Sequence, residues 1–212
     1  MPRSQNRTAR GQNPAAREQI LTAAREEFAE AGYNGGRIDS IARRSGLNKQ
    51  LVYYYFGSKD DLYRAALEAI YSEIRLKERE LDLRTLPPEE AITRLIDFSL
   101  NYLAQHNEFI RMLADENAMG APHMQNAETM LATNSPLISM IGATLRDGEA
   151  QGIFRKGVDP LELYISIAGM TFFYFANGKT MSAIFGRNLA DPAVIESYRS
   201  HIVTMVLKGL RA

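Results

Sequence analysis

Residues 38–67 read IDSIARRSGLNKQLVYYYFGSKDDLYRAAL, and this stretch decides the fold. Apolar residues recur at helical spacing on both sides of Gly46, a residue that accepts the positive φ of a tight bend. Ala42 is small enough to let two short helices approach closely, and Val52 with Phe56 anchors the second helix. This spacing predicts a helix-turn-helix, whose second helix enters the major groove of DNA. A plain helical hairpin within a bundle is the alternative.

Three consecutive tyrosines, Tyr53, Tyr54 and Tyr55, lie on the second short helix. Successive helical residues turn by roughly 100°, so the three rings cannot all face one core. We expect hydroxyl groups here to donate to DNA phosphates, contacts that position a protein without reading its sequence. Packing against the preceding long helix is the alternative for each tyrosine, and most of all for Tyr54.

The charge of the chain is unevenly distributed. Its 212 residues are 45% hydrophobic and 24% charged, the balance of a globular protein, and the formal net charge is zero. Residues 1–59 nevertheless carry ten Lys or Arg against five Asp or Glu. A basic first quarter predicts a polyanionic partner, with chance clustering on a solvated face as the alternative. The chain has no cysteine, which excludes disulfides and cysteine zinc sites.

No segment alternates apolar and polar residues for long enough to form a strand, so an all-α fold is expected. The predicted helices cover residues 14–32, 37–45, 49–56, 58–81, 88–104, 107–118, 123–133, 135–151, 160–184 and 192–210. We expect three parts, namely a flexible basic arm (1–13), a DNA-binding domain (14–60) and a ligand-binding and dimerisation body (61–212). The apolar stretch 163–178 is too short to span a bilayer, and residues 1–13 are no signal peptide, so we expect no membrane partner and a cytoplasmic location.

The stretch 38–67, preceded by PAAREQILTAAREEFAEAGY, resembles the DNA-binding domain of the tetracycline-repressor (TetR) family of bacterial regulators over about residues 14–70. The resemblance implies a homodimer that binds double-stranded operator DNA and a small-molecule effector, with no cofactor. It also implies phosphate contacts by Tyr53, Tyr55 and Lys59. Where the family commonly has a Thr-Ser pair, this chain has Gly36-Arg37, which removes a capping hydroxyl. Where the family commonly has a histidine, it has Tyr55.

Base reading is expected from the exposed start of the second short helix. The candidate residues are Asn48, Lys49, Gln50 and Leu51, with Arg37 nearby and Tyr54 beside the phosphate contacts. Lysine suits guanine, glutamine suits adenine, and leucine suits the thymine methyl group. Three arginines of the arm, at positions 3, 7 and 10, suit the minor groove, with a solvated tail as the alternative.

The middle of the chain combines methionines with aromatic and polar residues, and methionine adapts to irregular ligands. The candidate pocket residues are His106, Phe109, Arg111, Met112, Glu116, Asn117, Met124, Phe172, Phe173 and Asn177. Ordinary core packing is the alternative for each of them.

Residues 160–184 and 192–210 are apolar on more than one face, which predicts a dimer interface. The C-terminal stretch resembles regulators of small aromatic or N-heterocyclic acid breakdown, which implies an acidic effector.

An enzyme is not expected, because the chain has no phosphate loop, nucleophile elbow or HExxH motif. The histidines at 106, 123 and 201 lack metal-ligand spacing, and no metal site is expected. Two alternatives to an effector-released repressor remain open. One is a metal-sensing regulator that uses His123 with Asp115 or Glu116. The other is a helical interaction protein that does not bind DNA.

Overall fold

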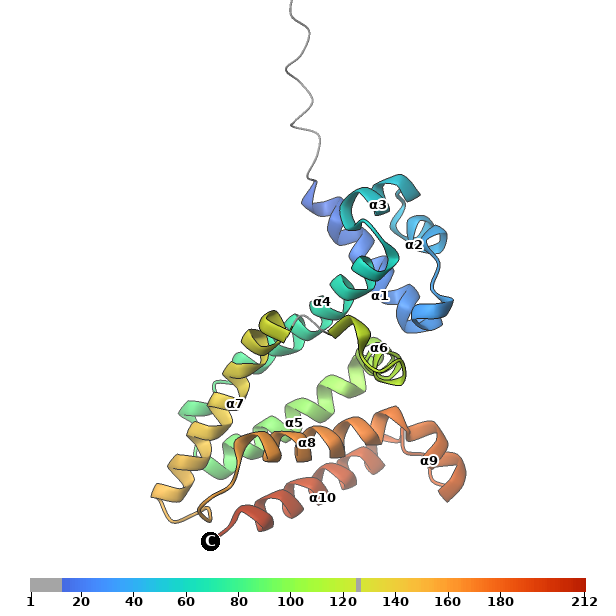
Figure 1. Ribbon diagram of the computed structural model, residues 1–212. Coiled ribbons are helices and arrows are strands. Elements are labelled where there is room, and N and C mark those ends of the chain that lie inside the picture. Colours follow the sequence, from blue (N-terminus) through green and yellow to red (C-terminus); the bar gives the residue numbers. More distant parts are fainter. Residues whose placement is uncertain (1–12, 125–126) are drawn as a thin grey trace, which may run out of the picture. The chain divides into compact units, whose positions relative to one another are not determined.

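The computed structural model describes residues 13–124 and 127–212. The ordered elements of this part are helices, which confirms the predicted fold class, and an isolated bridge pairs Phe154 with Arg211 (Figure 1). The predicted arm, with the arginines at 3, 7 and 10, lies outside the described residues except for Asn13. The helices are α1 (Pro14–Gly35), α2 (Ile38–Ser45), α3 (Lys49–Phe56), α4 (Lys59–Arg79), α5 (Pro88–Gln105), α6 (Asn107–Ala118), α7 (Ala127–Ala150), α8 (Pro160–Ala176), α9 (Gly178–Phe185) and α10 (Pro192–Leu210), with 3₁₀ turns at Leu83–Thr85 and Pro122–Met124.

The predicted helices 160–184 and 135–151 differ from those of the structure. The first is two helices, α8 and α9, because Asn177 has φ −106° and ψ 4° and interrupts the helical backbone. The second does not begin at Pro136, which lies inside α7. Leu137 and Ile141 of α7 are buried in a core, and their burial outweighs the backbone hydrogen bond that proline removes.

The chain folds into two compact units. Unit 1 comprises residues 1–69 and 111–125, and unit 2 comprises residues 70–110 and 126–212. Helices α1, α2 and α3 belong to unit 1, and α5, α7, α8, α9 and α10 belong to unit 2. Helices α4 and α6 each contribute residues to both units.

The core of unit 1 forms where α1 packs against α2 and α2 against α3. Its buried side chains include Ile20, Leu21, Ala24, Phe28, Ile38, Ile41, Val52, Phe56, Leu62 and Tyr63. The rings of Phe28 and Tyr63 meet edge to face with centroids 4.9 Å apart. Gly36 connects α1 to α2, and its backbone lies close to the Phe28 ring. A Cβ atom at this position would lie 2.6 Å from a carbon of that ring.

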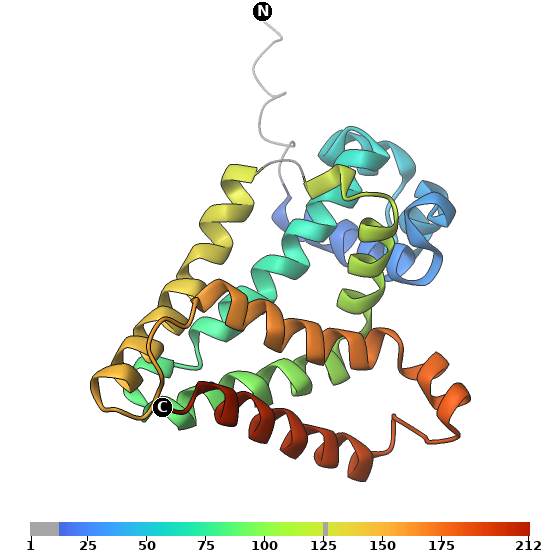
Figure 2. The same ribbon diagram turned by 60° about the horizontal axis from the view of Figure 1, so that its bottom comes forward.

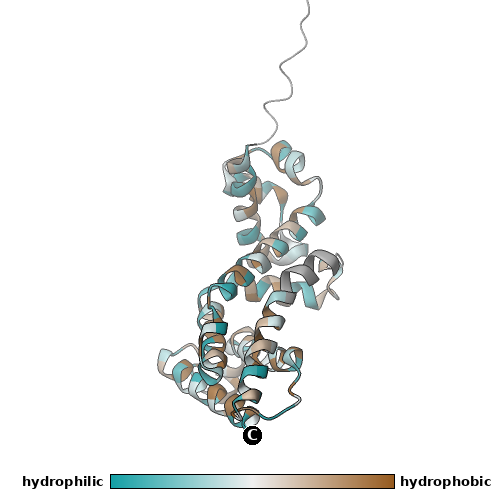
Figure 3. Cartoon of the chain, turned by 90° about the vertical axis from the view of Figure 1, so that its left-hand side faces the viewer, coloured by the Kyte–Doolittle hydropathy of each residue, from teal (hydrophilic) through white to brown (hydrophobic). Residues whose placement is uncertain are grey.

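The core of unit 2 surrounds α5, which contacts α7, α8 and α10 (Figure 2). Its buried residues include Leu83, Ile92, Leu95, Ile96, Leu100, Leu137, Ile141, Leu145, Phe154, Leu163, Ile167, Ile202, Val206 and Leu210. Figure 3 shows hydrophilic and hydrophobic residues mixed along the helices of the chain, as expected for amphipathic helices that pack one face against a core. The Arg199 guanidinium on α10 donates two 2.6 Å hydrogen bonds to Asp97 on α5.

None of the helices in the described part of the chain combines the length and the apolar character needed to cross a membrane.

Candidate DNA-reading site

The helix expected to read DNA, α3, follows a tight bend and is capped at its start. Gly46 takes φ 68° and ψ 16°, the left-handed conformation that glycine adopts without strain. The Asn48 side chain accepts a hydrogen bond of 2.9 Å from the backbone nitrogen of Leu51, which satisfies a donor at the first turn. Gly57, with φ 78°, ends the helix. The helices α2 and α3 therefore form the predicted helix-turn-helix.

The predicted base-reading residues lie at this capped end. Asn48, Lys49 and Gln50 are exposed, Leu51 is half-buried, and Arg37 is exposed just before α2. The Lys49 ammonium lies 3.0 Å from an Asp39 carboxylate oxygen, and this hydrogen bond raises the pKa of Lys49. Both partners are open to solvent, so Lys49 can exchange Asp39 for a base or a phosphate at little cost.

The three tyrosines have different surroundings. Tyr53 and Tyr54 are 43% and 63% exposed, whereas Tyr55 is half-buried. The Tyr55 hydroxyl accepts a hydrogen bond of 3.1 Å from the backbone nitrogen of Asn13, the residue that caps α1, and donates one of 3.4 Å to its carbonyl oxygen. For Tyr55 the alternative of contact with the first helix therefore applies, because its phenol reaches the start of α1, and the phosphate contacts of the three tyrosines stay a prediction.

Lys59 begins α4 immediately after the turn that ends α3. Its ammonium lies 4.7 Å from the centroid of the Tyr33 ring, a cation–π contact. The Tyr33 hydroxyl donates to Asp60, and this hydrogen bond raises the pKa of Tyr33 to about 12. The aromatic ring therefore holds the Lys59 charge at the first turn of α4 without neutralising it.

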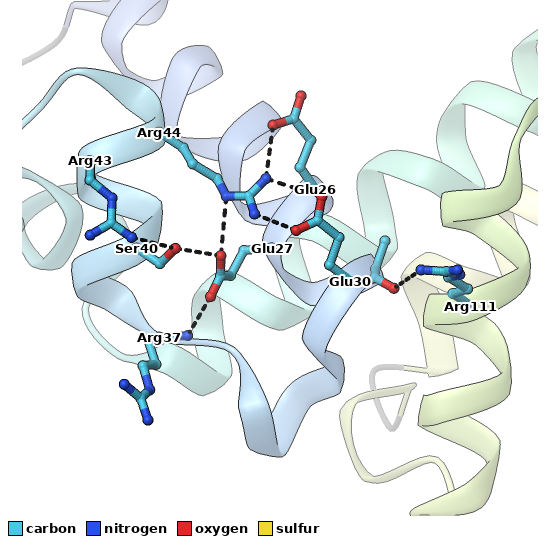
Figure 4. A network of polar contacts seen from close by, with 9 residues as sticks. Glu26, Glu27, Glu30, Arg37, Ser40, Arg43, Arg44 and Arg111 are labelled. Atoms are coloured by element: carbon cyan, nitrogen blue, oxygen red, sulfur yellow. Dashed lines mark hydrogen bonds and ion pairs between the residues drawn. The ribbon is translucent and has the colours of Figure 1, made fainter.

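A buried glutamate that the sequence analysis missed fixes α2 against α1. Glu27 is 6% exposed, and its carboxylate accepts hydrogen bonds from the backbone nitrogen of Arg37 at 3.1 Å and from the Ser40 hydroxyl at 2.6 Å (Figure 4). The Arg44 Nε atom lies 3.2 Å from the same carboxylate. Glu27 thus holds the start of α2 against α1, although the N-cap residue Arg37 makes no side-chain capping hydrogen bond. The sequence did carry a signal for this role, because Glu27 lies next to Phe28 on the apolar face of α1.

The residues predicted to line an effector pocket are divided between the two units. Unit 1 contains Arg111, Met112, Glu116, Asn117 and Met124, and unit 2 contains His106, Phe109, Phe172, Phe173 and Asn177. In unit 2, His106 stacks on Tyr102 at 4.0 Å and Phe109 meets the same ring edge-on at 6.0 Å. Phe173 is 53% exposed. The pocket itself stays a prediction.

Within unit 1, Met112 and Glu116 are fully buried, whereas Arg111 is exposed and donates to the carbonyl oxygen of Ala29 at 3.5 Å. The Glu116 carboxylate accepts a hydrogen bond of 2.7 Å from the backbone nitrogen of His123 and pairs with its Nδ1 atom at 2.8 Å. Among the described residues, no three metal-ligating side chains gather at one place. Glu116 and His123 pair with each other, and the metal-sensing alternative stays a hypothesis.

A second group that the sequence analysis missed lies in unit 2, where Arg75 and Glu78 of α4 form an ion pair. Their side chains are 5% and 3% exposed, and Arg75 also donates to the Tyr164 hydroxyl at 2.7 Å. The signal was in the helical pattern, because Glu78 follows the buried Ile70 and Ile74 at the spacing of the core-facing stripe.

Two family models match this chain. Residues 20–66 match the model described as bacterial regulatory proteins of the tetR family. Residues 88–206 match the model described as the tetracyclin repressor-like C-terminal domain.

Curated proteins and solved structures agree with these matches. The HTH-type transcriptional repressor NicS of Pseudomonas putida is 33% identical over 195 residues, which cover 92% of both chains. The HTH-type transcriptional regulator RutR of Escherichia coli is 26% identical over 199 residues, covering 93% of this chain and 91% of RutR. The crystal structure of the TetR family regulator PfmR from Thermus thermophilus has the same fold, with a TM-score of 0.67 at 23% identity over 92% of this chain and 97% of PfmR.

Proposed function

Because the chain belongs to the tetracycline-repressor (TetR) family of bacterial transcriptional regulators, we propose that it is a dimeric repressor which a small-molecule effector releases from its operator. The family consists of DNA-binding regulators rather than enzymes. The observation that carries the proposal is the capped start of α3, which presents Lys49 and Gln50 to solvent. The repressor NicS, at 33% identity, supports repression rather than activation.

Contacts to DNA are divided between reading and positioning residues. Lys49 and Gln50 lie at the N-terminal end of α3, the part of a recognition helix that meets base edges. Tyr53 is exposed farther along the same helix, and Lys59 follows its end. We assign the first two residues to base reading and the last two to phosphate contacts, which carry no sequence information.

A second copy of the chain is the partner that we assign to the apolar surface of α8 and α10. Leu161, Ile165 and Phe173 on α8 are 50%, 58% and 53% exposed, and Met205 on α10 is 47% exposed. Between these helices lies a groove of about 400 Å³, lined in part by Ser166 and Met205. Such side chains each contribute about 1.5–3 kcal/mol when fully buried. Two DNA half-sites at a fixed spacing also require two α3 helices.

The effector that we propose is a small molecule with an apolar body and an acidic group. It binds the body of the protein and shifts the population towards a form whose reading helices no longer match the half-sites. By linkage, an effector that weakens DNA binding tenfold must itself bind the DNA complex about tenfold more weakly.

The test is a DNA-binding titration with DNA from upstream of the protein's own gene and with scrambled DNA, at several salt concentrations. Lys59→Ala should weaken binding to both DNAs equally and reduce the log–log salt slope by about one unit. Gln50→Ala should lose about 1–3 kcal/mol of preference at one position of each half-site. Tyr53→Phe should cost roughly 1 kcal/mol with little change in slope. Equal loss on both DNAs for Gln50→Ala would contradict its reading role.

Assembly and effector binding need separate measurements. Light scattering at micromolar concentration should give twice the mass of the 23.8 kDa chain, and the monomer mass would contradict the dimer. A metabolite screen should contain a compound that raises the melting temperature and lowers DNA affinity. If no compound does both, constitutive repression becomes the better account.

A further inference from the structure

The ion pair between Arg75 and Glu78 is the most deeply buried charge pair in the described part of unit 2. One terminal nitrogen of the Arg75 guanidinium donates to Glu78, and the other donates to the Tyr164 hydroxyl at 2.7 Å. The guanidinium carbon also lies 5.3 Å from the centroid of the Tyr164 ring. Arg75 is therefore held between a carboxylate of its own helix and an aromatic ring on α8.

Stability does not explain this pair. Transferring two charges into a protein interior costs several kcal/mol for each ion, and well-packed apolar residues often replace such pairs at no loss. Glu78 continues the stripe formed by Ile70 and Ile74, a position where an apolar side chain would pack against the core. The charges therefore point to a role other than holding the body together.

The two members of the pair are not equivalent. Burial raises the pKa of Glu78 even though Arg75 opposes the shift. Burial also disfavours the charged form of Arg75, but Glu78 and Tyr164 together outweigh it and raise the pKa of Arg75. Burial therefore outweighs the partner's effect on the pKa of Glu78 but not on that of Arg75. Glu78 is also in the last turn of α4 and is followed by the exposed Arg79.

We propose that Arg75 is the anchor for a small organic carboxylate, which takes the place of the Glu78 carboxylate on the guanidinium. The planar guanidinium matches a carboxylate with two parallel hydrogen bonds. The Tyr164 hydroxyl, which accepts from Arg75, donates its own proton to the incoming anion. This assignment rests on the proposed function, because it names the group that holds the acidic effector. It places the anchor on α4, the helix that begins at Lys59.

The experiment uses the purified full-length chain and a panel of small aromatic and aliphatic monocarboxylates, each matched by its primary amide. Binding is measured by titration calorimetry and by the shift in melting temperature. At least one carboxylate should bind the wild type while its amide does not. Glu78→Gln, which removes the competing anion, should bind that carboxylate at least about tenfold more tightly and regain melting temperature when it is added.

Two further variants keep the test independent of folding. The double variant R75M/E78L replaces the ion pair by apolar side chains, so it should fold and lose carboxylate binding. Glu73→Gln is the matched control, since Glu73 lies on the same helix, is 31% exposed and pairs with Lys77. It should bind as the wild type does. Retained binding by the double variant, or no tighter binding by Glu78→Gln, would overturn the assignment. So would a panel in which no carboxylate binds either the wild type or Glu78→Gln.

Release from operator DNA, measured with the same proteins, tests the repressor proposal separately from the Arg75 anchor. If a neutral compound releases the wild type and carboxylates do not, the repressor proposal stands and the Arg75 anchor is wrong. If carboxylates bind through Arg75 and DNA affinity does not change, the anchor stands and effector-driven release is wrong.

Discussion

Unit 1 and unit 2 each contain a glutamate paired with an arginine, and the two pairs differ in what surrounds the carboxylate. Glu27 in unit 1 accepts from a backbone nitrogen and a hydroxyl, and its partner Arg44 is 32% exposed. Glu78 in unit 2 faces Arg75, and both are almost fully buried. A buried carboxylate stabilises a fold when it satisfies backbone donors and leaves its cation in contact with water. When the cation is buried too, the desolvation penalty makes the pair replaceable.

The largest effect should come from breaking the fully buried pair. Arg75→Met leaves the Glu78 carboxylate buried without its cation, and we expect a loss of about 3–5 kcal/mol in the free energy of unfolding by urea. R75M/E78L should unfold within about 1 kcal/mol of the wild type, because the apolar pair carries no such penalty. If the double variant were as unstable as the single one, the ion pair would be structural and the contrast with Glu27 would fail.

Removing the Glu27 carboxylate of unit 1 should have the second largest effect on stability. Glu27→Ala leaves the Arg37 backbone nitrogen and the Ser40 hydroxyl without their acceptor, and we expect a loss of about 2–3 kcal/mol in urea unfolding. Glu26→Ala is the matched control, because Glu26 also pairs with Arg44 but its side chain is 58% exposed. We expect that control to stay within about 0.5 kcal/mol of the wild type. Equal losses in both variants would assign the stabilisation to Arg44 rather than to the hydrogen bonds that Glu27 accepts.

The pair between Asp97 and Arg199 of unit 2 tests how the cost of breaking an ion pair depends on partial burial. It has two good hydrogen bonds, but its side chains are 23% and 33% exposed. Asp97→Asn should therefore cost about 1 kcal/mol or less in the same unfolding assay. A loss as large as that of Arg75→Met would mean that geometry, rather than burial, sets the cost of breaking an ion pair here.

The smallest change in stability should come from the exposed pair between Asp39 and Lys49. Asp39→Asn releases the Lys49 ammonium, so the urea midpoint should not move while affinity for operator DNA at low salt rises by about twofold. Glu18→Gln removes an exposed acid of α1 and controls for the general loss of negative charge. An equal rise in both variants would show that Lys49 gains nothing specific from losing its partner.

Local sequence patterns were enough to predict the helix-turn-helix. A positive-φ glycine, an Asn cap and apolar residues at helical spacing act over a few residues, and α3 has the predicted bounds, Lys49–Phe56. The contacts of Glu27 and of Arg75 were not predictable in this way. Ser40 and Arg44 lie 13 and 17 positions from Glu27, and Tyr164 lies 89 positions from Arg75, so tertiary packing decides which partners they meet. The break at Asn177 was missed although Asn177-Gly178 is a turn dipeptide, because apolar residues continue on both sides of it.

The hydrogen bonds between Tyr55 and Asn13 determine where a label can be attached without disturbing DNA binding. A fluorophore attached at Asn13 would begin beside α3, the helix to which we assign base reading. At the other end, the Ala212 backbone nitrogen donates to the Ile153 carbonyl oxygen at 3.2 Å within unit 2. We therefore propose immobilisation through Ala212 for affinity measurements, and a dye at Asn13 to report on bound DNA.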